Sequence, residues 1–178
     1  MSKLPLTPSQ TVGPFLHIGL IWADATDVVP ADWPAAIWVH GHVYDGAGEP
    51  VLDAMVETWQ ADPAGGFDDQ ASFRAFGRSA TEPGGEWGVR TVKPGVVASI
   101  DGTTQAAHID VSVFARGLLD RVVTRIYFDD EHAANRADPV LSTVAVHRRE
   151  TLIARTDPGG YGFDIHLQGT AETVFFDL

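Results

Sequence analysis

The stretch Ile37–Tyr44, which reads IWVHGHVY, decides the fold class of this chain. Its apolar residues Ile37, Val39 and Val43 alternate with polar or aromatic residues, and positions two apart lie on the same face of an extended strand. The run DGAGEP at 45–50 follows directly, and such clusters of Gly, Asp and Pro form turns. The sequence therefore predicts a strand with one apolar face that ends in a tight turn.

Short apolar runs of this kind recur along the rest of the chain. The 18 Gly and 11 Pro residues among 178 fall largely between these runs, a spacing typical of all-β proteins. A single short helix is expected near 130–136, ahead of the break at Asp138-Pro139. Further strands are expected at 54–59, 86–92, 108–114, 122–128, 150–155, 162–167 and 173–176. The predicted fold is all-β, a β-sandwich of about eight short antiparallel strands.

The first 36 residues differ from the rest of the chain. They contain five prolines together with the aromatic residues Phe15, Trp22 and Trp33. Because proline lacks the backbone donor that a sheet needs, this segment cannot form a continuous strand. We expect residues 1–36 to be an irregular segment of the same domain that contacts a partner, and residues 37–178 to form the sandwich. A length of 178 residues fits one such domain.

Composition excludes several classes of function. Twelve Lys and Arg stand against 24 Asp and Glu, and the net charge of −12 opposes binding to nucleic acid or to an anionic membrane surface. The absence of Cys excludes disulfides, thiolate metal sites and thiol nucleophiles. There is no G-x-S-x-G elbow and no Gly-rich phosphate loop. No apolar run has the length of a signal peptide core or a membrane span, and we expect a cytoplasmic protein.

The pair His108 and Asp110 is a candidate for metal chemistry. Two residues apart on a predicted strand, both side chains project from one face. Iron(II) oxygenases use two His and one carboxylate, and His147 or His166 would complete such a set. A polar strand face in a chain with seven His explains the same pattern without a metal.

A second pair, His40 and His42, shares the polar face of the strand at 37–44. Trp38 and Tyr44 lie on that face too. A half-buried aromatic surface explains this pair as well as metal binding does.

Several motifs, taken in order, resemble those of the intradiol ring-cleaving dioxygenases. They begin with TPSQTVGPF at 7–15 and end with ETVFFD at 172–177. Between these lie GHVYDGAGEPV (41–51), VETWQAD (56–62), FGR (76–78), TVKPG (91–95), AHI (107–109), FARG (114–117), RIYFDD (125–130) and RRETLIA (148–154). The resemblance spans nearly the entire chain, and the order and separation of the motifs make it specific. It implies the β-sandwich fold of that family.

The resemblance also implies where iron would be held, and the chain departs from that pattern. Iron-binding members hold non-haem Fe(III) with two Tyr and two His, the latter written A-H-I-H. Here Phe67 and Val97 stand at the two tyrosine positions and Asp110 at the second histidine position, which leaves His108 alone. Ferric ion loses its anionic oxygen donors in this way. We expect four vestigial ligand positions, with Phe67 and Val97 as packing residues, and no metal on this chain.

Within the family, this chain is most similar to α subunits that act beside a homologous, iron-bearing β subunit. The resemblance implies an obligate αβ pair within a larger oligomer that cleaves protocatechuate with O₂ to 3-carboxy-cis,cis-muconate, in the β-ketoadipate pathway of aromatic catabolism. No residue of this chain alone is expected to be catalytic. By the same resemblance, Thr11, Gly13, Pro14 and Arg116 line the substrate site of the partner.

Two other interpretations of the sequence remain. The chain could be a structural subunit that stabilises its partner without touching substrate. It could also be an independent iron(II) oxygenase, with His108, Asp110 and either His147 or His166 as ligands.

Overall fold

The computed structural model describes residues 6–67, 73–99 and 102–177. Within them the helical elements are α1 (Phe15–Leu20), α2 (His132–Ala137) and the two 3₁₀ helices η1 (Leu141–Thr143) and η2 (Val146–Leu152). The strands are β1 (Ile37–Tyr44), β2 (Met55–Gln60), β3 (Phe76–Ala80), β4 (Glu86–Thr91), β5 (Val97–Ala98), β6 (Thr104–Gln105), β7 (His108–Phe114), β8 (Val122–Phe128), β9 (Ile153–Asp157), β10 (Gly160–Gly162) and β11 (Ile165–His166).

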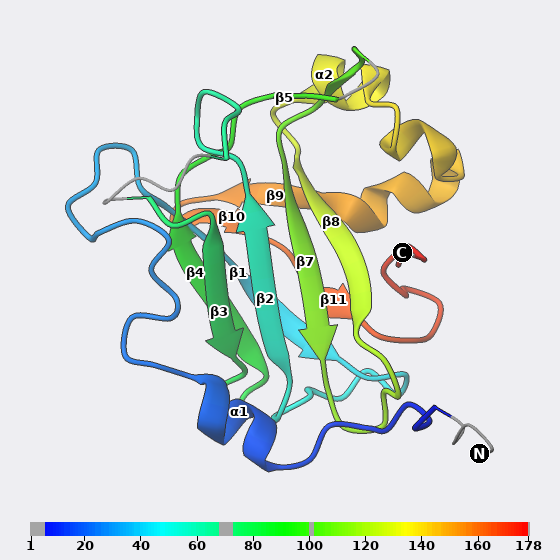
Figure 1. Ribbon diagram of the computed structural model, residues 1–178. Helices are drawn as coiled ribbons and strands as arrows, with labels where there is room; N and C mark the ends of the chain where they lie inside the picture. Colours follow the sequence, from blue (N-terminus) through cyan, green and yellow to red (C-terminus); the bar gives the residue numbers. More distant parts are fainter. Residues whose placement is uncertain (1–5, 68–72, 100–101, 178) are drawn as a thin grey trace, which may run out of the picture.

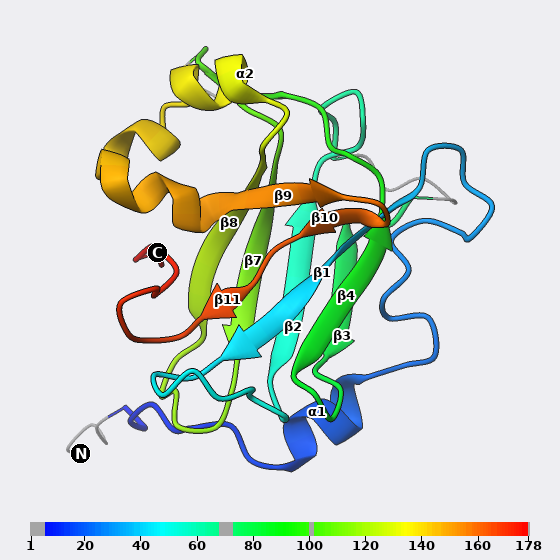
Figure 2. The same ribbon diagram turned by 180° about the vertical axis from the view of Figure 1, so that it is seen from behind.

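Nine of these strands form one hydrogen-bonded sheet, which curls into a nearly closed, barrel-like shape. The order is β11-β1-β10-β9-β8-β7-β2-β3, with β4 also paired to β1, while β5 and β6 form a separate small ribbon. Figures 1 and 2 show β7, β8 and β2 on one side of the molecule, with β1, β9 and β10 facing them from the other. The prediction of a mostly-β fold is confirmed, but a sandwich of two separate sheets is not, because the path through the strands is continuous.

The expectation that all strands pair antiparallel was wrong. β1 runs parallel to both β10 and β11, and β8 runs parallel to β9. A parallel pair needs a long crossover, and the segment containing α2, η1 and η2 supplies it between β8 and β9. The sheet is therefore mixed.

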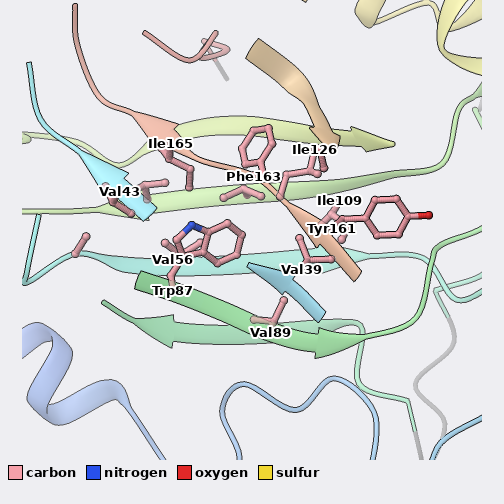
Figure 3. Packing of buried hydrophobic residues seen from close by; sticks show 14 of the residues in the cluster. Val39, Val43, Val56, Trp87, Val89, Ile109, Ile126, Tyr161, Phe163 and Ile165 are labelled. Atoms are coloured by element: carbon pink, nitrogen blue, oxygen red, sulfur yellow. The ribbon is translucent and has the colours of Figure 1, made fainter. Parts of the chain in front are cut away.

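The alternating pattern that predicted β1 places its apolar face in the main core (Figure 3). Val39 and Val43 are buried there, and Ile37 packs against the same cluster. β7 contributes Ile109, Val111 and Val113 by the same alternation. Burial of such side chains contributes about 1.5–3 kcal/mol each, which makes this cluster the main source of stability.

Three predicted strands, β1, β7 and β8, have the predicted bounds, whereas other elements differ. Much of 150–155 belongs to η2, and 173–176 forms no strand. There, Thr173 and Phe176 bond to single residues of other segments, His166 and Val123, so no ladder develops. β3 was missed because its sequence, FGRSA, carries only one large apolar side chain.

The N-terminal segment is less irregular than expected. It contains α1, so the described chain has two α-helices rather than the single one predicted. Residues Ala25, Val28 and Val29 are buried, and Asp27 forms a β-bridge with Arg90. The second half of the segment is therefore packed into the domain.

Among the described residues, none of the helices combines the length and the apolar character needed to cross a membrane.

Candidate functional site

The structure brings together some of the vestigial ligand positions. His108 and Asp110 both lie on β7, and Asp110 is opposite Trp59 of β2 in the register. Phe67 follows β2 and stacks on Trp59, with ring centroids 6.3 Å apart. Phe67 thus packs against Trp59 at the surface rather than in the interior, because both rings of this stack are exposed. Val97 lies on β5, partly buried.

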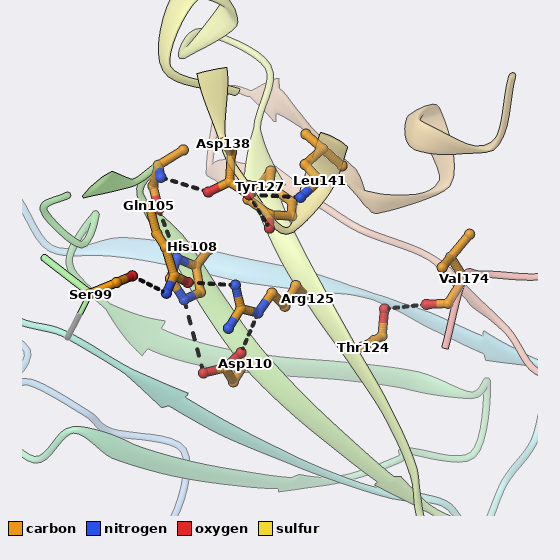
Figure 4. A network of polar contacts seen from close by, with 11 residues as sticks. Ser99, Gln105, His108, Asp110, Thr124, Arg125, Tyr127, Asp138, Leu141 and Val174 are labelled. Atoms are coloured by element: carbon orange, nitrogen blue, oxygen red, sulfur yellow. Dashed lines mark hydrogen bonds and ion pairs between the residues drawn. The ribbon is translucent and has the colours of Figure 1, made fainter. Parts of the chain in front are cut away.

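An arginine that sequence reasoning missed lies beside these positions. Arg125 of β8 is directly opposite Asp110 in the antiparallel register. Its Nε lies 2.8 Å from Asp110 Oδ1, and its Nη1 donates to Gln105 Oε1 at 2.7 Å (Figure 4). Burial alone would lower the pKa of Arg125, but the charge of Asp110 and the contact with Tyr127 outweigh it, and the pKa is raised. The guanidinium of Arg125 is therefore a permanent positive charge beside the Asp110 carboxylate.

His108 is held in one tautomer as a neutral ring. Its Nδ1 lies 2.7 Å from the carbonyl oxygen of Ala106, which can only accept, so Nδ1 carries the proton. Nε2 is left with its lone pair, 4.0 Å from Asp110 Oδ2. Burial and the nearby charge of Arg125 lower the pKa of His108.

This lowered pKa predicts a pH dependence of stability. Below 6.5, the ordinary value of the group, the unfolded chain takes up a proton that native His108 resists, so stability falls as the pH falls through this window. His108→Asn keeps a donor for Ala106 and removes the titration. We expect the urea midpoint of the wild type to drop more steeply than that of the variant between pH 7.5 and 5.5, by at most about 1.4 kcal/mol per pH unit. Parallel curves would contradict this.

The residues at this site do not fit a ferric ion. Phe67 and Val97 have no donor atoms, and the one carboxylate, Asp110, is already neutralised by Arg125. Among the residues that the structure describes, no three His, Asp or Glu side chains are grouped as metal ligands.

The other histidines considered as ligands lie elsewhere. His147 is exposed on η2, and His166 of β11 stacks on Tyr44 with ring centroids 5.0 Å apart. Neither joins His108 and Asp110, so the arrangement of donors does not support the iron(II) oxygenase interpretation.

The positions expected to line a partner's site gather at the other end of β7. Arg116 lies two residues after Phe114, the last residue of that strand, its side chain is 74% exposed, and its Nε forms an ion pair with Asp53. The backbone N–H of Gly117 donates to Thr11 Oγ1 at 2.9 Å, so the N-terminal segment is tied to the Arg116 loop. Arg116 and Asp53 also line a cleft of about 590 Å³.

The other two positions expected to line the partner's site follow Thr11 in the N-terminal segment. Gly13 and Pro14 are exposed, and the carbonyl of Gly13 accepts from Leu16 N at 3.1 Å at the start of α1. Apart from its two neighbours in the chain, no described residue has an atom within 4 Å of where a Cβ on Gly13 would lie. The described residues therefore leave the surface at Gly13 uncovered.

The two groups of positions are separated by the length of β7, since His108 begins the strand and Phe114 ends it. Six steps along a strand span about 20 Å. Within this chain, Arg116 and Thr11 cannot act on a ligand held at His108.

The pair on β1 has ordinary surface partners. His40 Nε2 lies 2.8 Å from Asp157 Oδ2, and His42 lies near Asp164 and Glu86. Tyr44 stacks between His42 and His166. This arrangement agrees with the interpretation of a half-buried aromatic face.

A dioxygenase family model matches residues 24–169 of the chain. With this match, the chain belongs to the intradiol ring-cleaving dioxygenase family, as its motifs predicted.

Among curated proteins, the chain is 46% identical to a protocatechuate 3,4-dioxygenase alpha chain from Pseudomonas putida, covering 98% of both chains. It is 43% identical over the full length of the corresponding alpha chain from Burkholderia cepacia. Similarity to the beta chain from Burkholderia cepacia is lower, at 31% identity, over 77% of this chain and 66% of the other.

Solved structures show the same fold at low sequence identity. The dioxygenase domain of a carbohydrate-binding fusion protein from Streptomyces sp. SirexAA-E aligns with a TM-score of 0.60 at 24% identity, covering 92% of this chain and all of that domain. Catechol 1,2-dioxygenase from Pseudomonas arvilla C-1 aligns with a TM-score of 0.61 at 22% identity, over 80% of this chain and 55% of the other.

Proposed function

We propose that this chain is the α-type subunit of a protocatechuate 3,4-dioxygenase and acts beside a homologous β subunit. The enzyme cleaves the ring of protocatechuate between its two hydroxylated carbons, and both atoms of O₂ enter the product, 3-carboxy-cis,cis-muconate. Full-length identity to two alpha chains supports the assignment, and the lower identity to a beta chain supports a homologous partner.

The observation that carries this proposal is the separation of the two groups of positions on β7. Among the described residues, the end with His108 and Asp110 has no group of three His, Asp or Glu ligands, and a guanidinium neutralises its carboxylate. The opposite end presents an exposed arginine, tied to Thr11 through Gly117. An arginine there serves chemistry that takes place on another chain.

In this proposal the residues of the chain bind and orient substrate rather than react with it. The guanidinium of Arg116 would attract the anionic substrate, an attraction that is strong only when water is excluded. Gly13 allows backbone to approach closely, and Pro14 stiffens the loop. The non-haem Fe(III) that activates the catechol would be held by the partner.

The assembly and location follow from the same proposal. We propose an obligate αβ pair within a higher oligomer, with residues 1–36 contributing to the contact. Interfaces of this kind commonly bury more than about 2,000 Å². Exposed apolar side chains on and around α1, including Phe15, Ile18 and Trp22, would supply part of it. The enzyme would work in the cytoplasm, in aromatic catabolism.

Substituting Arg116 tests this function. In the assembled enzyme, Arg116→Ala is expected to lower kcat/KM for protocatechuate by about 10- to 100-fold, or about 1–3 kcal/mol, while iron content stays unchanged. Oxygen uptake and metal analysis of the co-expressed αβ enzyme measure both quantities.

The matched control is Arg155→Ala, which removes another exposed arginine, 63% exposed and paired with Glu150, from β9. Thr11→Val, which removes the hydroxyl that binds Gly117, should lower kcat/KM in the same direction. If Arg116→Ala and Thr11→Val both match the control, the chain is a structural subunit without substrate contact.

A further inference from the structure

The partly buried guanidinium of Arg125 is the feature that the proposed function leaves unexplained. Its side chain is only 18% exposed, yet it carries a full charge between β7 and β8. It bonds the Asp110 carboxylate on one side and the Gln105 amide oxygen on the other. Gln105 is held in turn by its own donation to Ser99 Oγ at 2.8 Å. These acceptors converge on a single cation (Figure 4).

The same acceptors, with His108, have the chemistry of a metal site. The hydrogen bond from Nδ1 to Ala106 fixes the ring and leaves Nε2 as the donor atom, as in histidines that bind metals. Nε2 and Asp110 Oδ2 are 4.0 Å apart, so one ion between them could contact both. One imidazole, one carboxylate and one amide oxygen suit divalent transition metals, such as Zn²⁺ or Co²⁺, better than Fe(III).

We propose that Arg125 is a built-in substitute for a metal ion. It supplies the positive charge that pairs with the Asp110 carboxylate, whose side chain is 39% exposed, and it keeps divalent metals away from His108, Asp110 and Gln105. A divalent cation that enters the site would be repelled by the fixed positive charge of Arg125, and the Asp110 carboxylate would already be paired with that charge. The proposal concerns only residues of this chain and does not depend on the substrate or on the iron of a partner.

The test is metal uptake after removal of the guanidinium. Assembled, tag-free enzyme carrying Arg125→Met is dialysed against Co²⁺, and bound cobalt is counted relative to the wild type, which cancels any site on the partner. We expect one further Co²⁺ per α chain in the variant. Its affinity at this site should be at least tenfold higher than that of the wild type, and it should show the visible absorption of an imidazole-coordinated ion.

Two controls define the site. Arg90→Met removes a comparable arginine, 24% exposed, whose partner Asp27 lies 2.7 Å away and has no His two residues from it. It should gain no cobalt. In the double variant Arg125→Met/His108→Phe the extra ion should be lost.

In Arg125→Gln the new side chain is close in size to Arg and can still donate to Asp110. This variant therefore provides the metal-uptake test if Arg125→Met does not assemble. It should show the same extra ion with weaker binding, because its amide competes for Asp110. The proposal is overturned if the assembled variant binds no more cobalt than wild type and Arg90→Met, or if His108→Phe leaves the gain intact.

Discussion

Asp138→Ala is expected to lower the free energy of unfolding by about 3–5 kcal/mol. The residue is 0% exposed and follows α2. It accepts three hydrogen bonds, from Ala106 N at 2.8 Å, Leu141 N at 2.7 Å and Tyr127 Oη at 3.0 Å. Burial raises the pKa of Tyr127, so its hydroxyl stays protonated and able to donate. Removal of the carboxylate leaves these three donors in the interior without the acceptor that they bind.

Urea unfolding at fixed protein concentration measures this loss. Asp138→Asn keeps one acceptor oxygen and should cost less than the alanine. Asp129→Ala serves as a control, since this exposed carboxylate also accepts bonds from a backbone N–H and a hydroxyl, both of Thr156. A loss for Asp138→Ala no larger than that of the control would show that the three bonds do not hold the crossover to the sheet.

Gly160→Ala should destabilise the protein by more than about 3 kcal/mol, well above the usual cost of a point substitution. Gly160 has a φ of +147°, a conformation that residues with a Cβ rarely adopt, and a Cβ there would lie 2.0 Å from the carbonyl oxygen of Trp38. That oxygen belongs to β1, the parallel neighbour of β10. The two strands would have to move apart, and the sheet would open between them.

Gly48→Ala separates backbone strain from this clash. Gly48 also has positive φ, +81°, but a Cβ there would meet nothing within 4 Å. It should cost only about 1 kcal/mol. Thermal unfolding of both variants compares the two effects, and equal losses would mean that the contact with Trp38 is not what requires glycine.

The Asp138 network and the Arg125 network share one end of the sheet. Tyr127 is the link, because it donates to Asp138 and also contacts Arg125. At this end of β7 the polar side chains therefore bond to other residues of the same chain, whereas Arg116 at the other end is exposed. This difference between the two ends of one strand supports the proposal that the chain contributes to a partner's site.

Sequence motifs were sufficient to predict the family, while the departures from its iron ligands at Phe67, Val97 and Asp110 stay a prediction. They did not reveal Arg125. Its role depends on lying opposite Asp110 in the β7–β8 register, and that register follows from the exact turn between the strands. A basic residue on a predicted strand gives no sign of its partner.

By itself the sequence determined the strands β1, β7 and β8, because alternation with a period of two is a local property that each strand carries in its own residues. It also determined the family, through short motifs that can each be identified from a local stretch of residues and that follow one another along nearly the entire chain. Only the tertiary structure decided the parallel pairing of β1 with β10, the place of Arg125 and the requirement for glycine at 160. Each of these depends on how one strand is placed against another, and no single strand carries that information in its own residues.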